Sequence, residues 1–183
     1  LEGLGDNYSI FREMVMERVE KVFDKNASTP IGIDPTGNTV YDSVFTFKSP
    51  YFENKKMDLY SESMHATMFI PSNTLVENAL RDAKERLKEW GMERADSILN
   101  NWIFQSAFYD VEYKKEDFGN VNKPDLISIF NQQWRTTINT VDLDNPIEMS
   151  NGIAYYVTSL KIPTNAVLIW RIKEFFCPAW NAP

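Results

Sequence analysis

The sequence predicts an α+β domain in which helices come first and strands follow, and not an alternating βαβ fold. Three observations lead to this prediction. Apolar residues recur at helical spacing near the start of the chain and again over residues 74–90. Residues 31–70 and 127–162 are rich in β-branched and aromatic side chains between turn signals. The chain has 183 residues, enough for one domain with a core of its own.

The first helix is expected to begin near Asp6, Asn7 and Ser9, whose side chains suit a helix N-terminus. Five apolar residues then fall on one helical face, with charged residues elsewhere: Phe11, Met14, Val15, Val19 and Val22. This spacing predicts an amphipathic helix of about four turns that faces the core. Residues 26–30 are expected to end it.

Residues 31–70 are predicted to be rich in strands. The run from Asp34 to Asn38 contains proline and glycine in the order that a tight turn requires, so a hairpin is expected to reverse there. Residues 51–63 are polar and charged, which indicates a surface segment. The apolar run 66–70 stops at Pro71 and predicts a buried central strand that carries Phe69 and Ile70.

The second half is expected to hold two more helices and then strands. Thr74 and Glu77 fit a capping box, which predicts a helix from this point to Gly91. A shorter helix is expected near residues 93–100. Strands are then predicted by three β-prone segments: 127–130, 134–141 and 153–162.

Composition and charge exclude some classes of function. Asp and Glu outnumber Lys and Arg by 26 to 19, and the basic residues are scattered. Nucleic-acid readers carry a basic face because phosphate neutralisation supplies much of their affinity, so no nucleic-acid partner is expected. No apolar run is long enough to span a membrane, because Arg171 interrupts the richest one.

The usual catalytic and metal-binding signatures are missing from the sequence. It contains no G-x-S-x-G, no H-E-x-x-H and no phosphate-binding glycine loop. His65 is the only histidine, and a structural role is favoured over that of a general base. Cys177 is the only cysteine. Asp142, Asp144 and Asn145 fit a turn better than a calcium loop. We therefore expect no catalytic residue, no metal ion and no cofactor.

Three segments resemble the boxes of one known family. Residues 66–73 (Ala-Thr-Met-Phe-Ile-Pro-Ser-Asn) resemble the first conserved box of the fasciclin domain. Residues 98–104 (Ile-Leu-Asn-Asn-Trp-Ile-Phe) resemble its isoleucine-leucine segment. Residues 150–157 (Ser-Asn-Gly-Ile-Ala-Tyr-Tyr-Val) resemble its second box, and residues 160–163 its usual close. The opening helix from Tyr8 fits as well, so the resemblance spans about residues 8–163.

The resemblance implies a fasciclin-like β-wedge of two small sheets, with helices packed near the N-terminal half. The domain would occupy residues 1–163 with an insertion at about 27–65, and residues 164–183 would be an extension or the start of a following domain. The family often has tyrosine-histidine where this chain has Asn101-Trp102, so integrin recognition does not carry over, and Trp102 is expected to fill core space. The insertion resembles those of fasciclin-like surface lipoproteins from Bacteroidetes.

The function that the resemblance implies is non-enzymatic adhesion or ligand binding at the cell surface. The domain would be extracellular or in the cell envelope, anchored by a segment outside this one, and its partner would be a protein or a glycan; no oligomeric state is indicated. One alternative is a glycan-binding accessory module of a bacterial polysaccharide-uptake system, with a stacking platform of Tyr51, Phe52 and Tyr60. A remote alternative is a hydrolase with His65 beside two carboxylates.

Overall fold

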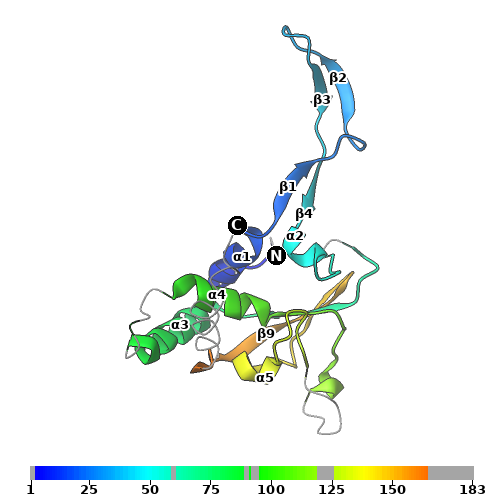
Figure 1. Ribbon diagram of the computed structural model, residues 1–183. Helices are drawn as coiled ribbons and strands as arrows, with labels where there is room; N and C mark the ends of the chain where they lie inside the picture. Colours follow the sequence, from blue (N-terminus) through cyan, green and yellow to red (C-terminus); the bar gives the residue numbers. More distant parts are fainter. Residues whose placement is uncertain (1–2, 59–60, 89–90, 92–94, 119–125, 165–183) are drawn as a thin grey trace.

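The computed structural model describes residues 3–58, 61–88, 91, 95–118 and 126–164. It is an α+β domain from which a narrow two-stranded ribbon projects (Figure 1). The elements follow one another along the chain as η1 Asp6–Tyr8, α1 Ser9–Met16, β1 Glu20–Phe23, β2 Thr29–Ile33, β3 Thr39–Asp42, β4 Phe45–Lys48, α2 Pro50–Glu53, β5 Ala66–Ile70, α3 Asn73–Lys88, α4 Asp96–Gln105, β6 Phe108–Tyr109, η2 Lys115–Asp117, α5 Trp134–Thr137, β7 Ile138–Val141, β8 Ile147–Met149 and β9 Gly152–Leu160.

A mixed sheet organises the body of the domain. Its strand order is β6-β5-β9-β7. The short strand β8 also pairs with β9, at residues 152–154, whereas β7 pairs with residues 157–160. The two middle strands, β5 and β9, run parallel with Ala66 opposite Gly152. The prediction of a buried central strand is confirmed, because Phe69 and Ile70 are 0% and 1% exposed on β5. The expectation of two small sheets is replaced by this five-stranded sheet and two separate strand pairs.

The core lies on both faces of the sheet, because successive residues of a strand point to opposite sides. Ile70 faces the cluster formed with α1, α3 and α4, which also contains Phe11 and Leu99. Phe69 faces a second cluster that contains Trp134 and Tyr155. The helices thus cover one face of the sheet, and α5 with its neighbouring loops covers the other.

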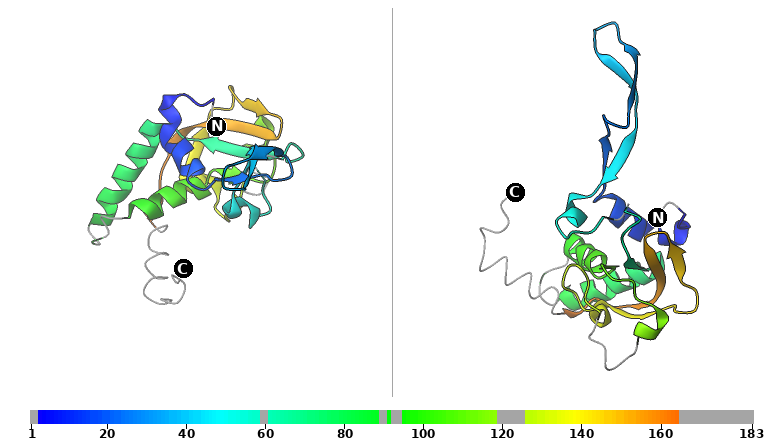
Figure 2. Two further views of the ribbon diagram at one scale, coloured as in Figure 1. Left: turned by 90° about the horizontal axis from the view of Figure 1, so that it is seen from above. Right: turned by 90° about the vertical axis from the view of Figure 1, so that its right-hand side faces the viewer.

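The projecting ribbon, called the arm below, comprises residues 20–48. Its lower part pairs β1 with β4, and its upper part pairs β2 with β3 (Figure 2). The predicted hairpin turn is confirmed: the Gly37 and Asp34 N–H groups donate to the carbonyls of Asp34 and Asn38, respectively, at 2.9 Å. Gly37 has a φ of +88°, which glycine adopts without strain. The arm extends away from both the helices and the sheet.

The first helix is shorter than the sequence predicts. α1 ends at Met16, and the N–H groups of Arg18 and Val19 bond to carbonyls three residues earlier, which tightens the helix end. The Arg18 guanidinium donates to a further carbonyl of the last turn. Val19 and Val22 therefore lie outside the helix, and residues 20–23 form β1 instead. Valine and phenylalanine favour strands, and β4 offers them a pairing partner.

The capping box predicted at Thr74 and Glu77 is also wrong. α3 starts at Asn73, so Ser72 and not Thr74 precedes its first residue. The Ser72 carbonyl accepts the Val76 N–H at 3.0 Å, and its hydroxyl accepts the Leu75 N–H at 3.4 Å. The predicted end at Gly91 agrees with a φ of +67° at that residue.

The remaining elements agree in part with the sequence-based expectations. The second helix of this region runs on to Gln105, beyond the expected residue 100. Residues 127–130 make a single bridge, Ile127 to Gln133, and the 134–141 segment divides into a helical turn and β7. β9 matches the predicted 153–162 strand closely. No helix in the described part of the chain combines the length and apolar character that a membrane span requires.

Candidate methionine-lined binding pocket

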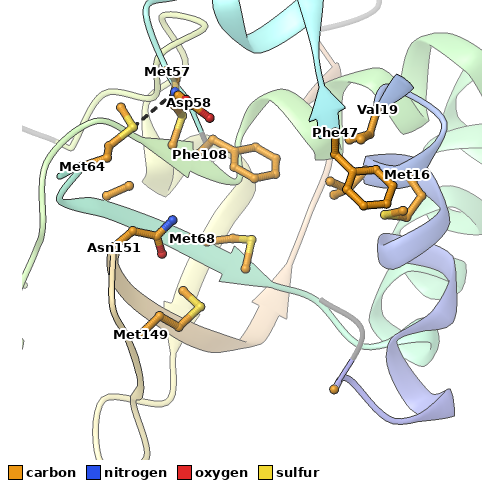
Figure 3. Close-up of a pocket in the computed structure, with 13 residues that line it drawn as sticks. Met16, Val19, Phe47, Met57, Asp58, Met64, Met68, Phe108, Met149 and Asn151 are labelled. Atoms are coloured by element: carbon orange, nitrogen blue, oxygen red, sulfur yellow. Dashed lines mark hydrogen bonds between the residues drawn. The ribbon is translucent and has the colours of Figure 1, made fainter. Parts of the chain in front are cut away.

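The most distinctive site is an open apolar cavity of about 520 Å³ where the arm joins the body (Figure 3). The chain contains seven methionines, and five of them line this cavity: Met16, Met57, Met64, Met68 and Met149. Phe47 and Phe108 add aromatic walls. The polar side chains at its border belong to Asp58 and Asn151. We call this cavity the methionine pocket.

The pocket exists because the helix layer covers the sheet incompletely. Ala66, Met68 and Ile70 alternate along β5 and share the helix-facing side of the sheet. Ile70 is 1% exposed beneath the helices, whereas Ala66 and Met68 are only half-buried and line the cavity. α1 ends at Met16, at the cavity wall. The pocket is thus an unfilled continuation of the helix-side core.

The segment predicted as an insertion supplies part of the wall. Phe47 comes from the base of the arm, and Met57, Asp58 and Met64 come from the segment that follows it. The Asp58 N–H donates to the Met64 sulfur at 3.3 Å, which joins the two ends of that segment across the cavity border. Residues far apart in the sequence, from α1 to the β8–β9 turn, therefore meet in one site.

The chemistry of this lining favours binding to apolar groups. Methionine side chains are unbranched and polarizable, so they adapt to ligands of different shape. The rim is open to solvent, because Met16, Phe47 and Met149 are 38%, 38% and 40% exposed. The lining contains one carboxylate and one amide side chain among its apolar groups. These features suit recognition by packing and do not assemble a nucleophile with a base.

A second, shallower hollow of about 250 Å³ lies beside α2. Its lining contains Tyr51, Asn54, Lys55, Gln105 and Phe130. The Tyr51 and Phe130 ring centroids are 5.2 Å apart. The Gln105 amide donates to the Tyr51 hydroxyl at 2.9 Å and accepts from the Gln132 amide at 3.1 Å. The Oε1 atom of Gln132 is buried and has no hydrogen-bond partner among the residues that the structure describes.

The structure separates the three aromatic residues that the sequence singled out. Phe52 is 1% exposed and packs against Phe104 and Phe108, so its ring belongs to the core and offers no stacking surface. Tyr51 is half-buried at the shallow hollow, where its hydroxyl donates to the side-chain Oδ1 atom of Asn101 at 3.1 Å. Tyr60 lies outside the described residues.

The other residues considered from the sequence have structural surroundings. Trp102 is half-buried against the core, and its indole N–H donates to the Thr137 hydroxyl at 2.6 Å. His65 is exposed, with its Nδ1 atom 3.4 Å from a Glu112 carboxylate oxygen, and borders neither hollow described above. In the described part of the chain, no group of three or more histidine, cysteine, aspartate or glutamate residues is placed to hold a metal ion.

The predicted turn after β7 is confirmed. The Asp142 carboxylate accepts the Asp144 N–H at 3.0 Å and the Asn145 amide at 2.8 Å. The pKa of Asp142 is therefore lower than its ordinary value. The hydrogen bond from the Asn145 amide is the largest cause, and that from the Asp144 N–H is the next. Lys115 pairs with Asp144 across the turn at 2.5 Å. The polar groups of Asp142, Asp144 and Asn145 therefore stabilise the turn by hydrogen bonding to one another.

Sequence reasoning missed the methionine pocket. Its lining comes from separate segments, and single apolar residues on a helix or strand predict burial and not a cavity. One signal was available: methionine recurs at positions 57 and 64, in the largely polar stretch before the apolar run 66–70, and again at position 68.

Comparisons of the chain with protein-family models, with curated proteins and with solved structures found no match. Inferences about function therefore rest on the residues and the geometry described above.

Proposed function

We propose that this chain is a non-enzymatic ligand-binding or adhesion module of the cell surface, and that the methionine pocket is its binding site. The observation that carries the proposal is the pocket itself: five methionines and two phenylalanines surround an open volume of about 520 Å³ at the edge of the core. Protein interiors are otherwise close-packed, so an apolar opening of this size favours occupation by a partner group.

The order and pairing of the elements support a fasciclin-like fold. The first family-like box, residues 66–73, forms β5 and the start of α3. The second, residues 150–157, forms the turn before β9 and most of that strand. The two boxes pair in parallel in the middle of the sheet, and the third family-like segment lies on α4, which packs over the same cluster. The proposed β-wedge is the body without the arm.

The chemistry of the pocket indicates a protein partner that presents a flexible apolar side chain. A rim of methionine and phenylalanine gains from burial of such a group, at about 25 cal/mol per Å² of apolar surface removed from water. The net charge of −7 argues against nucleic acid. Attachment to a cell envelope would come from an anchor outside this segment.

The experiment is a binding screen of the purified chain on arrays of extracellular-matrix proteins and of glycans. Met16→Glu and Met149→Glu each place a charge on the exposed rim, and we expect either to abolish binding to a protein hit. The matched controls are Val111→Glu and Ile127→Glu, because these side chains are similarly exposed, 48% and 49%, and are not part of the pocket lining. Binding that survives both rim variants would refute the proposed site.

A glycan-binding function is the second candidate, and the shallow hollow at Tyr51 favours it. Aromatic rings at 5.2 Å beside amide groups are the combination that sugar sites use for stacking and hydrogen bonding. On the same array, a glycan hit that is lost in Gln105→Leu but kept in Met16→Glu would assign the function to this hollow. A protein hit with the opposite pattern would assign it to the methionine pocket.

A further inference from the structure

One face of the arm carries apolar side chains from its tip to the methionine pocket, with Thr39 and Lys21 among them. On the lower part, Phe23 is opposite Phe45, and Phe47 follows on the same face two residues along β4. The Phe23 ring is in edge contact with the ring of Tyr41, with centroids 5.5 Å apart. Tyr41 continues the face onto the upper part of the arm.

The same face reaches the tip. Ile33 is opposite Thr39, which lies two residues before Tyr41 on β3 and so shares its face. Ile33 is 75% exposed, the highest value among the large apolar side chains described. At the other end, Phe47 lines the pocket beside Met16. The face therefore runs Ile33, Tyr41, the Phe23–Phe45 pair, Phe47 and then the pocket.

This exposure is concentrated on the arm. Most of the large apolar side chains that the described residues expose belong either to the arm or to the pocket rim: Phe23, Ile31, Ile33, Val40, Val44, Phe45, Phe47, Met16 and Met149. Val40 precedes Tyr41 on β3 and so points to the other side of the arm, whereas Ile33, Phe23, Phe45 and Phe47 lie on the face traced above. Exposed apolar side chains gathered on one face mark an interaction site. An isolated two-stranded ribbon is only marginally stable in water, so the arm gains stability from a covering partner.

We infer that the partner covering this face is the same face of a second copy of this chain, packed in the opposite direction about a two-fold axis. The inference rests on the proposed function, because it names the partner of that binding site. In this arrangement the tip of each arm lies over the base of the other, where the pocket opens. Ile33 of one copy would cover Phe47 and the pocket rim of the other, and the aromatic cluster would pack on itself near the axis.

The order of residues along the face makes it self-complementary. A two-fold interface brings each residue against a different residue of the same surface, and the reverse contact follows by symmetry. Here the aliphatic tip meets the methionine and phenylalanine base, while the middle of the face is aromatic in both copies. About half of residues 20–48 lie on this face, so the pocket rim supplies the rest of the contact surface in each copy.

The charges of the arm agree with the antiparallel arrangement. The tip carries Asp34, whose pKa is held at about 2, so it stays ionised. The base carries Lys21, whose Nζ atom lies 4.3 Å from the centroid of the Phe45 ring, and Lys48 opposite Glu20. Lys21 lies opposite Phe47 on the apolar face, whereas Lys48 and Glu20 face the other side, so in the antiparallel pair the acidic tip approaches Lys21 of the other base. A parallel pair would instead place the two Asp34 carboxylates together, which is unfavourable.

Sedimentation velocity of the full chain from low to high micromolar concentration tests self-association. We expect a concentration-dependent dimer in the parent chain. Ile33→Lys is expected to raise the dimer dissociation constant by at least about tenfold, because the two-fold axis buries the new charge twice. Ile127→Lys is the matched control, since Ile127 is 49% exposed away from the arm, and should leave dimerisation unchanged. A parent chain that stays monomeric throughout overturns the inference.

Cross-linking tests the direction of pairing. In a Cys177→Ser background, Ile33→Cys combined with Phe47→Cys places thiols at the two ends of the arm. A short bismaleimide should link two copies of this double variant into a covalent dimer. The control pairs Ile33→Cys with Ile127→Cys and should stay uncoupled. Equal cross-linking of both variants would refute the antiparallel arrangement.

The two proposals can fail separately. If the chain is monomeric but Ile33→Lys or Met16→Glu abolishes binding to an array protein, the face serves a different partner: the inference is wrong and the proposed function stands. If the chain is monomeric and neither variant changes any binding, both proposals fail.

Discussion

At the scale of single residues, Gly152 explains why an asparagine-glycine pair opens β9. Its φ is +144°, a region that other residues rarely adopt. A Cβ atom at this position would lie 2.0 Å from the carbonyl oxygen of Ala66 on the paired strand β5. The absence of a side chain therefore allows β5 and β9 to begin their parallel pairing at this point.

Gly152→Ala should destabilise the domain by roughly 2–4 kcal/mol, because both the backbone conformation and the contact with Ala66 become unfavourable. Urea denaturation followed by tryptophan fluorescence measures the loss. Gly91→Ala is the matched control: its φ is also positive, at +67°, but nothing lies within 4 Å of the added Cβ. We expect a smaller cost there, about 1–2 kcal/mol. Equal losses in the two variants would contradict the close-approach argument.

Phe69→Ala should cost about 3–5 kcal/mol of unfolding free energy, because it leaves a cavity in the second core cluster. The Phe69 ring is 0% exposed and lies 5.0 Å from the Tyr109 ring and 6.1 Å from that of Trp134, centroid to centroid. Thermal denaturation of the variant and the parent gives the difference. A melting temperature close to that of the parent would show that this strand is not central to the core.

The Asp34 carboxylate at the tip of the arm should titrate at about pH 2 and not at its ordinary value of 3.8. Its Oδ1 atom accepts the Thr36 hydroxyl at 2.7 Å and the N–H groups of Thr36 and Asn38 at 2.9 and 2.8 Å. The folded pKa is lowered, so this stabilisation of the turn is complete above about pH 4 and is lost as the pH falls towards 2.

Carboxyl-detected NMR of the aspartate side chains measures that midpoint. Thr36→Val removes the hydroxyl bond, the largest cause of the lowered pKa, and should move the midpoint back towards 3.8. A parent midpoint that already lies near 3.8 would mean that the turn is not closed as described.

At the scale of elements, the arm and the segment after it differ in how they join the body. The hairpin at Asp34–Asn38 was predicted correctly from the sequence. The expected insertion at 27–65, however, is not one removable unit. Phe52 and Met57 lie inside it and are 1% exposed in the helix-side core. The part that stands free of the core is the upper arm, β2 and β3.

Replacing residues 29–42 by a short glycine turn should therefore leave a folded domain. The cut ends are adjacent, because the Val44 N–H donates to the Ser28 hydroxyl at 2.9 Å. Hydrogen exchange of the β5 and β9 amides should match that of the parent, whereas self-association should be lost. Global loss of protection in the shortened chain would show that the upper arm is part of the core.

Elements were predicted correctly where a single sequence pattern was present, and incorrectly where helical spacing and strand-forming residue types occurred in the same segment. The run 66–70 is apolar apart from Thr67 and is stopped by proline, and it forms the expected central strand. Val19 and Val22 continue the helical spacing of Phe11 and Met14, yet they are β-branched. Val22 pairs with Thr46 of the distant strand β4, and this pairing takes the chain out of the helix. Pairing between segments so far apart cannot be recognised from a short stretch of sequence.

At the scale of the whole molecule, the candidate site depends on the arrangement of all its layers. The pocket forms where three separate segments end together: α1 at Met16, the arm at Phe47 and the β8–β9 turn at Met149. None of these residues predicts a cavity alone, and Tyr51 and Phe52, which the sequence singled out, are not part of its lining. Binding at this site therefore depends on how the helices, the sheet and the arm pack together.

The most direct test of this account is NMR of the chain labelled with ¹³C at the methionine methyl groups, with and without a protein ligand from the array. We predict that binding shifts the signals of the pocket methionines: Met16, Met57, Met64, Met68 and Met149. Met14 serves as an internal control, because it is 5% exposed in the core and lies outside the pocket lining. A ligand that binds and leaves the pocket methionine signals unchanged would contradict the central claim.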